Sequence, residues 1–316
     1  MKRALIATVF NEADNIVRWW DCLMQQTVKP DEIIIVDGGS TDGTWEELQE
    51  LARRSLVPVK LAQRRCNIAE GRNHAIRLTD AEIIASTDAG CTPAAGWFGE
   101  ITRPLLENAT VDIIGGNNVP LFQNDFQKFL KHLDGDPAEP LTDGPHGSGR
   151  NTAYRRTLWA DVGGYPEWLT LTAEDLLFNY QWYCAGKKFF YQRTAVVHWP
   201  VRETAAAYFK MLYHYGYGAG EAGQESPYFL RRLVIVLFPP LLLLSRHRLA
   251  FLKFRYRRNA ASVRGWLAGR FQGHRPPPGW RRINKVYLSP ETQAWIARQK
   301  PAKHVEIPVE RPATGR

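Results

Sequence analysis

Short apolar runs alternate with amphipathic segments through the N-terminal third of the chain. The apolar runs predict buried strands, and segments whose apolar residues recur every three or four positions predict helices that pack one face on a sheet. In the first such helix, which Asn11 is expected to cap, the face comprises Ile16, Trp20 and Leu23. Strands are predicted at 4–10, 32–36, 57–61 and 82–87, with a helix after each of the first three. This order predicts an α/β fold with a mainly parallel sheet flanked by helices.

The pattern is less regular in the middle of the chain. Residues 134–149 are rich in Gly, Pro and Asp and predict a mobile loop. The flanking segments complete the predicted sheet domain, with strands at 111–114, 151–154 and 189–197 and helices at 122–133 and 172–185.

The C-terminal third is expected to form a helical, basic appendage. Residues 205–217 predict an aromatic helix. The apolar run 233–244 is shorter than the roughly 20 residues of a membrane-spanning helix, and Pro239 and Pro240 interrupt it. Its basic flanks favour a segment that lies on a membrane surface, and a buried helix hairpin is the alternative. The Pro-rich residues 273–316 predict a loosely ordered tail.

The charge of the chain indicates an anionic partner. Its formal net charge is +9, and residues 231–282 contain no Asp or Glu. Nucleic acid, an anionic membrane surface and phosphate-bearing substrates would each suit such a charge. Nucleic acid is not expected, because the basic segment contains no recognised binding module and no stacking pattern of aromatic residues.

The cysteines and the N-terminus indicate a reducing compartment. The four cysteines form no Cys-x-x-Cys pair, which argues against a zinc site and against a disulfide framework. The apolar run 4–10 is short and leads directly into Asn11 and Glu12, so it predicts a strand rather than a signal peptide. We therefore expect a cytoplasmic protein.

Three loops at the ends of predicted strands are candidates for a ligand site. Ligands of parallel sheets bind beyond the carboxyl ends of the strands, so loops 8–12, 37–43 and 87–92 should share one rim. Asp37 ends a strand before Gly38 and Gly39, and its carboxylate could accept hydrogen bonds from a base or ribose. The residues of each loop also favour a tight turn or a helix N-cap, and a purely structural role is the alternative interpretation.

Two other segments add charged candidates. A basic cluster at 64–74 that includes Arg72 suits a bound diphosphate, and a solvated cationic face is the alternative. The pair Glu174 and Asp175 follows Thr172, which as N-cap with Asp175 three positions later would form a capping box. The functional alternative is a general base directed at the cleft.

Taken together, these motifs resemble family 2 glycosyltransferases. The similar segments occur in the family's order and cover about residues 4–200: 8–16, 37–44, 70–73, 87–90 and 163–175. The resemblance implies a GT-A Rossmann-like fold, a nucleoside-diphosphate sugar such as a UDP-sugar as donor, and inversion at the anomeric carbon. The expected divisions are a catalytic domain at 1–204, with a nucleotide-sugar half at 1–118 and an acceptor half at 119–204, then a helical segment at 205–272 and the tail.

The resemblance also implies roles for individual residues. Phe10 and Glu12 would border the base and ribose, and Asp37 would hydrogen-bond to the base. Arg72 would lie near the diphosphate, and Asp88 would face the ribose or a metal ion. Asp175 would be the catalytic base, with Glu174 beside it. His198 resembles a position that helps to hold the metal.

One position departs from the family pattern. Gly90 stands where the second carboxylate of Asp-x-Asp usually holds the cation. Either Asp88 and His198 hold Mg²⁺ or Mn²⁺ together with water and phosphate oxygens, or Arg72 and helix amides meet the charge of the leaving group. The expected acceptor is a glycan or a lipid-linked hydroxyl in cell-envelope or exopolysaccharide synthesis, at the inner face of the plasma membrane.

Two rival functions remain. A sugar-phosphate nucleotidyltransferase should carry a Gly-rich N-terminal loop, but residues 8–15 contain no Gly. A catalytically inactive nucleotide-sugar-binding or scaffold protein of the same fold gains support from Gly90. Turnover of nucleotide sugars would separate it from a transferase.

Overall fold

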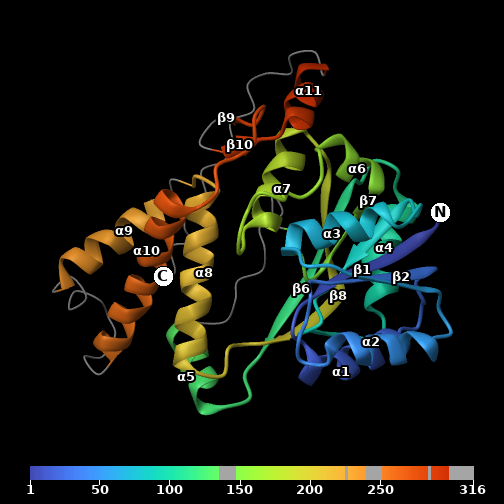
Figure 1. Cartoon of the computed structure of the whole chain (residues 1–316), viewed down its shortest axis with the longest axis horizontal. Coiled ribbons are helices and arrows are strands. Elements are labelled where there is room, and N and C mark those ends of the chain that lie inside the picture. Colours follow the sequence, from blue (N-terminus) through green and yellow to red (C-terminus); the bar gives the residue numbers. More distant parts are fainter. Residues whose placement is uncertain (135–146, 225–226, 240–250, 284–285, 299–316) are drawn as a thin grey trace.

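The strands of the N-terminal half form the parallel part of an eight-stranded sheet. A computed structural model describes residues 1–134, 147–224, 227–239, 251–283 and 286–298. Its sheet order is β3-β2-β1-β4-β7-β6-β8-β5 (Figure 1). The first four strands in this order run parallel, and they are β3 (Val59–Gln63), β2 (Glu32–Asp37), β1 (Arg3–Val9) and β4 (Ile83–Ser86). The predicted α/β class with a mainly parallel sheet is confirmed for this half.

The other four strands mix directions. β7 (Thr152–Arg155) is antiparallel to both β4 and β6 (Ile113–Leu121). β8 (Phe189–Pro200) is parallel to β6, and the two-residue β5 (Thr92–Pro93) is antiparallel to β8. β6 and β8 are longer than expected because their pairing continues past a register shift at Gly116 and Asn117.

Helices cover both faces of the sheet. Along β1, alternate residues pack into two separate cores, since Leu5 joins one cluster and Ile6 the other. On one face lie α1 (Ala13–Met24), α2 (Thr44–Arg53) and α4 (Trp97–Glu107), and on the other lie α3 (Ile68–Arg77), α6 (Arg156–Asp161) and α7 (Glu174–Cys184). Trp19 and Trp97 fill the first core, and Trp182 fills the second.

The first helix does not begin as predicted. Its N-cap residue is Glu12, and Asn11 has a left-handed φ of 53°. The Asn11 side chain instead accepts a hydrogen bond from the Thr41 backbone N–H, while the Asn11 N–H donates to the Ser40 hydroxyl. Asn11 therefore ties the loop after β1 to the loop after β2 rather than capping a helix.

Helices of the C-terminal part pack beside the sheet. α5 (Asp125–Asp134) contacts the start of α8 (Ala205–Glu221) through aromatic rings, and α8 runs along α10 (Leu252–Gln272), with α9 (Pro227–Leu237) against α10 (Figure 1). The α8–α10 approach is unusually close. A Cβ atom on any of four glycines would lie about 2 Å from a backbone oxygen of the opposite helix: Gly216, Gly220, Gly265 and Gly269. Only glycine permits backbones to approach this closely.

Regular structure extends into the predicted tail. β9 (Arg281–Ile283) and β10 (Val286–Leu288) form a hairpin, and α11 (Pro290–Arg298) follows. The Gln181 amide of α7 donates to the Tyr287 carbonyl at 2.7 Å, so the hairpin is joined to the sheet domain. The sequence analysis missed these elements because their contacts are made with distant parts of the chain.

Parts of some predicted segments lie outside the described residues. These are 135–146 of the expected mobile loop, 225–226 and 240–250 of the expected helical segment, which include 240–244 of the apolar run, and 284–285 and 299–316 of the tail. Over the described ranges, each helix is too short or too polar to cross a bilayer.

Candidate active site

A cavity of about 610 Å³ opens at the carboxyl ends of the parallel strands. It is lined by the loops that follow β1, β2 and β4, as the sequence predicts, and by residues that precede β7 and begin α7. Six candidate residues share it: Phe10, Glu12, Arg72, Asp88, Glu174 and Asp175. The size is typical of a small-molecule site, for which roughly 300–1,000 Å³ is usual.

Two candidates do not line this cavity. The Asp37 carboxylate is fully buried and accepts hydrogen bonds from the Ser40 N–H, the Ser40 hydroxyl and the Gln63 amide, the last at 2.8 Å. It orders the loop whose Gly38 does line the cavity. His198 lies within β8, where it pairs with Thr92 on one side and Val119 on the other.

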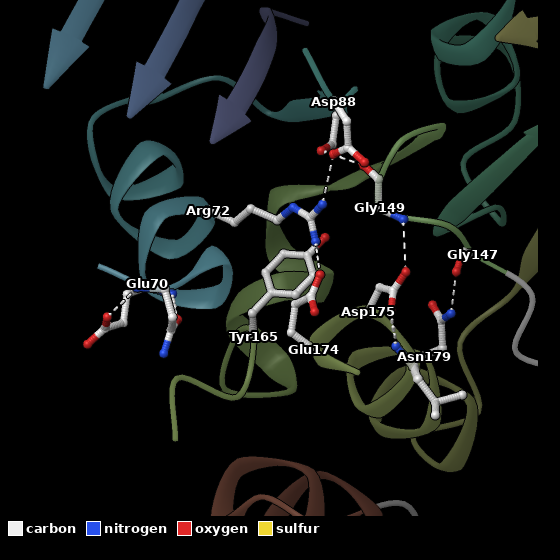
Figure 2. A network of polar contacts seen from close by, with 12 residues as sticks. Glu70, Arg72, Asp88, Gly147, Gly149, Tyr165, Glu174, Asp175 and Asn179 are labelled. Carbon is white, nitrogen blue, oxygen red and sulfur yellow. Dashed lines mark hydrogen bonds and ion pairs between the residues drawn. The ribbon is translucent and has the colours of Figure 1, made fainter. Parts of the chain in front are cut away.

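Arg72 joins the two sides of the cavity. Its Nη2 lies 3.1 Å from Asp88 Oδ1 and its Nη1 lies 2.6 Å from Glu174 Oε1 (Figure 2). The Tyr165 ring lies beneath the guanidinium, with its centroid 5.5 Å from Cζ. Burial by itself would lower the pKa of Arg72, but Glu174 and Asp88 raise it, so the group stays charged. A Cβ on Gly149 would fall 2.3 Å from Arg72 Nη2, so only glycine fits beside this pair.

Glu174 is a buried acidic partner of Arg72. Its side chain is about one-tenth exposed. Burial, the largest cause, and the neighbouring Asp175 raise the pKa of Glu174 to about 7, although Arg72 opposes both. The Glu174 carboxylate therefore holds the Arg72 guanidinium in place.

Asp175 presents its carboxylate to the cavity. Oδ1 accepts a hydrogen bond from the Leu176 N–H at 2.7 Å, and Oδ2 accepts from the Gly149 N–H at 3.3 Å (Figure 2). The predicted capping box with Thr172 is wrong, because the N-cap is Ala173 and the Thr172 hydroxyl donates to the His214 carbonyl. Ala173 has φ 76°, a strained conformation for a residue with a Cβ that is often found next to functional groups.

The sequence analysis missed three cavity residues. Arg150, Arg202 and Tyr215 come from the loop before β7, the turn after β8 and the exposed side of α8. Arg150 lies over the Trp199 ring, with Cζ 4.7 Å from the centroid, and it hydrogen-bonds to Tyr215. Although burial lowers the pKa of Arg150, Asp88 and Tyr215 raise it overall. The cavity therefore contains cationic groups besides Arg72, and each is a candidate to hold a diphosphate.

Comparison with known proteins decides the family. The family model described as Glycosyl transferase family 2 matches residues 4–163, just over half of the chain. The chain belongs to glycosyltransferase family 2.

Relatives and solved structures agree with this assignment. The family 2 chain is 28% identical over 117 residues to glycosyltransferase AglE of Haloferax volcanii, covering 36% of this chain and 38% of the relative. It is 26% identical over 210 residues to the O-antigen chain rhamnosyltransferase RfbN of Salmonella typhimurium, covering 62% and 66%. The chain thus spans less than two thirds of each relative.

Solved glycosyltransferases share the fold. Mannosyltransferase PcManGT from Pyrobaculum calidifontis, in complex with GDP-Man and Mn²⁺, aligns with a TM-score of 0.59 and 21% identity over 86% of this chain and 87% of that one. S. aureus TarS 1–349 in complex with UDP aligns with a TM-score of 0.51 and 13% identity over 91% and 96%. The family 2 chain therefore has the GT-A fold that the sequence predicts.

Two carboxylates of the family 2 site, Glu12 and Asp88, lie near Gly90, where the family pattern has a cation ligand. The described residues contain no group of three or more His, Cys, Asp or Glu side chains arranged to hold a metal ion. However, a Cβ on Gly90 would lie 3.9 Å from both carboxylate oxygens of Glu12. Glu12 therefore occupies the neighbourhood in which the missing Asp side chain would lie. Asp88 lies close enough to raise the pKa of Glu12, which burial raises most. Mg²⁺ is commonly bound by one or two carboxylates plus phosphates and water, so Glu12 and Asp88 fit such an ion.

Proposed function

We propose that this chain transfers a sugar from a nucleoside-diphosphate sugar to an acceptor hydroxyl, with inversion, in the synthesis of a cell-envelope glycan or exopolysaccharide. One observation carries the proposal: the Asp175 carboxylate of α7 and Glu12 and Asp88, from the loops after β1 and β4, line the same cavity. Support for the donor class comes from solved structures of the same fold, which hold GDP-Man, UDP and UDP-GlcNAc. Support for the pathway comes from the relative RfbN, an O-antigen chain rhamnosyltransferase.

In the proposed reaction Asp175 is the general base. Its carboxylate accepts the proton of the acceptor hydroxyl while the hydroxyl oxygen forms a bond to the anomeric carbon. The bond from that carbon to the diphosphate oxygen breaks on the opposite face, which inverts the configuration. The Gly149 N–H hydrogen-bonds to Asp175 and so orients its carboxylate.

The charge that develops on the departing diphosphate is met by cationic side chains. Arg150 and Arg202 line the cavity, and Arg150 lies near enough to Asp88 for that carboxylate to raise the pKa of Arg150. Fixed positive charge that acts where negative charge grows is usually the largest single contribution to such catalysis. Arg72 is already paired with two carboxylates, so we assign it to the framework of the site.

A divalent cation held by Glu12 and Asp88 would supply further positive charge at the diphosphate. Gly90→Asp, which restores the second carboxylate of the family motif, is expected to tighten Mn²⁺ binding by roughly tenfold in the presence of nucleoside diphosphate, because the site gains an anionic oxygen ligand. Isothermal titration calorimetry measures this directly. Gly96→Asp is the matched control, because a Cβ at Gly96 has no neighbour within 4 Å and Gly96 lies outside the cavity lining. Equal Mn²⁺ affinities for both variants would contradict the proposed ligands.

A donor panel tests the proposed function itself. Purified protein is incubated with individual UDP-, GDP- and dTDP-sugars and Mn²⁺, and release of nucleoside diphosphate is followed. We expect one donor to be hydrolysed slowly without acceptor and faster when glycan or lipid-linked acceptors are added. Tight donor binding with no release of nucleoside diphosphate from any donor would favour the inactive binding protein.

A further inference from the structure

A second cavity lies between α9 and α10, away from the active-site cavity. It measures about 200 Å³ and is lined by four arginines, Ile235 and Asn259; the arginines are Arg231, Arg232, Arg255 and Arg258. This volume is below the roughly 300–1,000 Å³ of typical ligand pockets, so it suits a small group rather than a whole nucleotide.

The lining concentrates positive charge. No carboxylate lines this cavity within the described ranges, and the sequence has none between residues 231 and 282. Arg232 is only 8% exposed, and its Nη1 lies 3.4 Å from the Ser262 hydroxyl. Burial lowers the pKa of Arg255, and the nearby Arg258 and Arg231 lower it further. Guanidinium groups match the geometry of phosphate oxygens, so a small cavity lined by four arginines suits a phosphate group.

An apolar stripe lies beside this cavity on α9. Leu230, Val234 and Leu237 recur at i, i+4 and i+7 and are 57%, 47% and 62% exposed. Phe238, directly after the helix, is 62% exposed as well. Residues with this spacing share one face of a helix, next to the face that carries Arg231.

We propose that α9 and α10 bind an anionic phospholipid, whose phosphate headgroup occupies the arginine cavity while the Leu230–Val234–Leu237 stripe enters the membrane interface. A helix with a basic side and an exposed apolar side binds a membrane through attraction to anionic lipids and through burial of its apolar side chains. The stripe favours a lipid over a soluble phosphate compound, because a soluble compound would not bury these apolar side chains. Because α8 packs along α10 and carries Tyr215 of the active-site cavity, the membrane would also hold that cavity near lipid-linked acceptors.

Vesicle sedimentation with the full chain tests this proposal. We expect binding to phosphatidylcholine vesicles that contain phosphatidylglycerol and little binding to phosphatidylcholine alone. Arg231→Ala/Arg255→Ala should reduce the partition coefficient about thirty-fold, since each basic residue near an anionic surface contributes a factor of about 5.5. Val234→Ser/Leu237→Ser should reduce it at unchanged net charge. Unchanged binding by either double variant would overturn the proposal.

Two controls separate the cavity from diffuse charge. Arg53→Ala/Arg54→Ala removes equal charge from exposed positions on α2, at the other end of the molecule, and should retain binding (Figure 1). Lys253→Ala/Arg257→Ala removes equal charge from exposed positions on α10 outside the cavity, and a thirty-fold loss there would show that the cavity is not the site.

Inorganic phosphate that releases the protein at submillimolar concentration would identify free phosphate as the ligand and overturn the lipid assignment. Thermal melting confirms that each variant folds, and donor hydrolysis should stay within twofold of wild type, which keeps this test separate from that of the proposed function.

Discussion

Replacing Asp175 by Asn is expected to lower the rate of sugar transfer by roughly 10²–10⁴-fold, the usual contribution of a general base. The amide keeps the shape of the side chain and can still accept a hydrogen bond from the Gly149 N–H. It cannot take the proton from the acceptor hydroxyl. Donor binding should stay nearly unchanged, because the expected nucleotide contacts, Glu12 and Asp88, come from the loops after β1 and β4 rather than from α7.

Steady-state transfer and calorimetric donor binding measure the two quantities separately. Asp125→Asn is the matched control, since Asp125 also lies in the first turn of a helix but is fully exposed and outside the cavity. It should retain transfer within about twofold. Transfer at the wild-type rate in Asp175→Asn would remove this carboxylate from the mechanism, whereas loss of donor binding would reassign it to the donor site.

Replacing Arg72 by Met is expected to lower the free energy of unfolding by about 3–5 kcal/mol, as is typical when one partner of a buried ion pair is removed. The change leaves Glu174 buried without its closest positive partner. It also removes the ion pair with Asp88 and the contact with the Tyr165 ring. Urea denaturation followed by tryptophan fluorescence measures the loss.

A double variant identifies the cause. Arg72→Met/Glu174→Gln should be more stable than Arg72→Met alone, because no uncompensated buried carboxylate remains. Arg77→Met is the control on the same helix, since it breaks the half-exposed pair with Glu167 and a contact with the Trp159 ring and should cost no more than about 1 kcal/mol. If Arg72→Met costs no more than Arg77→Met, the Arg72 ion pair does not hold the site together.

Sequence reasoning succeeded where local pattern and topology suffice. Apolar runs located β1, β2 and β4, and the rule that ligands bind beyond the carboxyl ends of parallel strands placed Glu12 and Asp88 at one rim. The side chains at the acceptor side followed from the family resemblance rather than from periodicity.

It failed where a long-range contact decides the outcome. Thr is a favoured helix N-cap residue, yet the Thr172 hydroxyl donates its hydrogen bond to the His214 carbonyl of α8. Arg150 follows a Gly-rich segment and belongs to no motif recognised in the sequence. Only the fold brings it into contact with Trp199 and Tyr215. Tyr215 shares a helical periodicity with buried residues, but it is 48% exposed and turns to the cavity.

The bridging position of Arg72 also limits how this scaffold can be recombined. One arginine on α3 contacts Asp88 from the expected donor half and Glu174 from the expected acceptor half. A chimera that takes residues 119–204 from a relative without an acidic side chain at position 174 would leave that guanidinium half-neutralised inside the protein. A chimera that exchanges acceptor specificity between such enzymes therefore has to include the arginine and both of its carboxylate partners from the same parent.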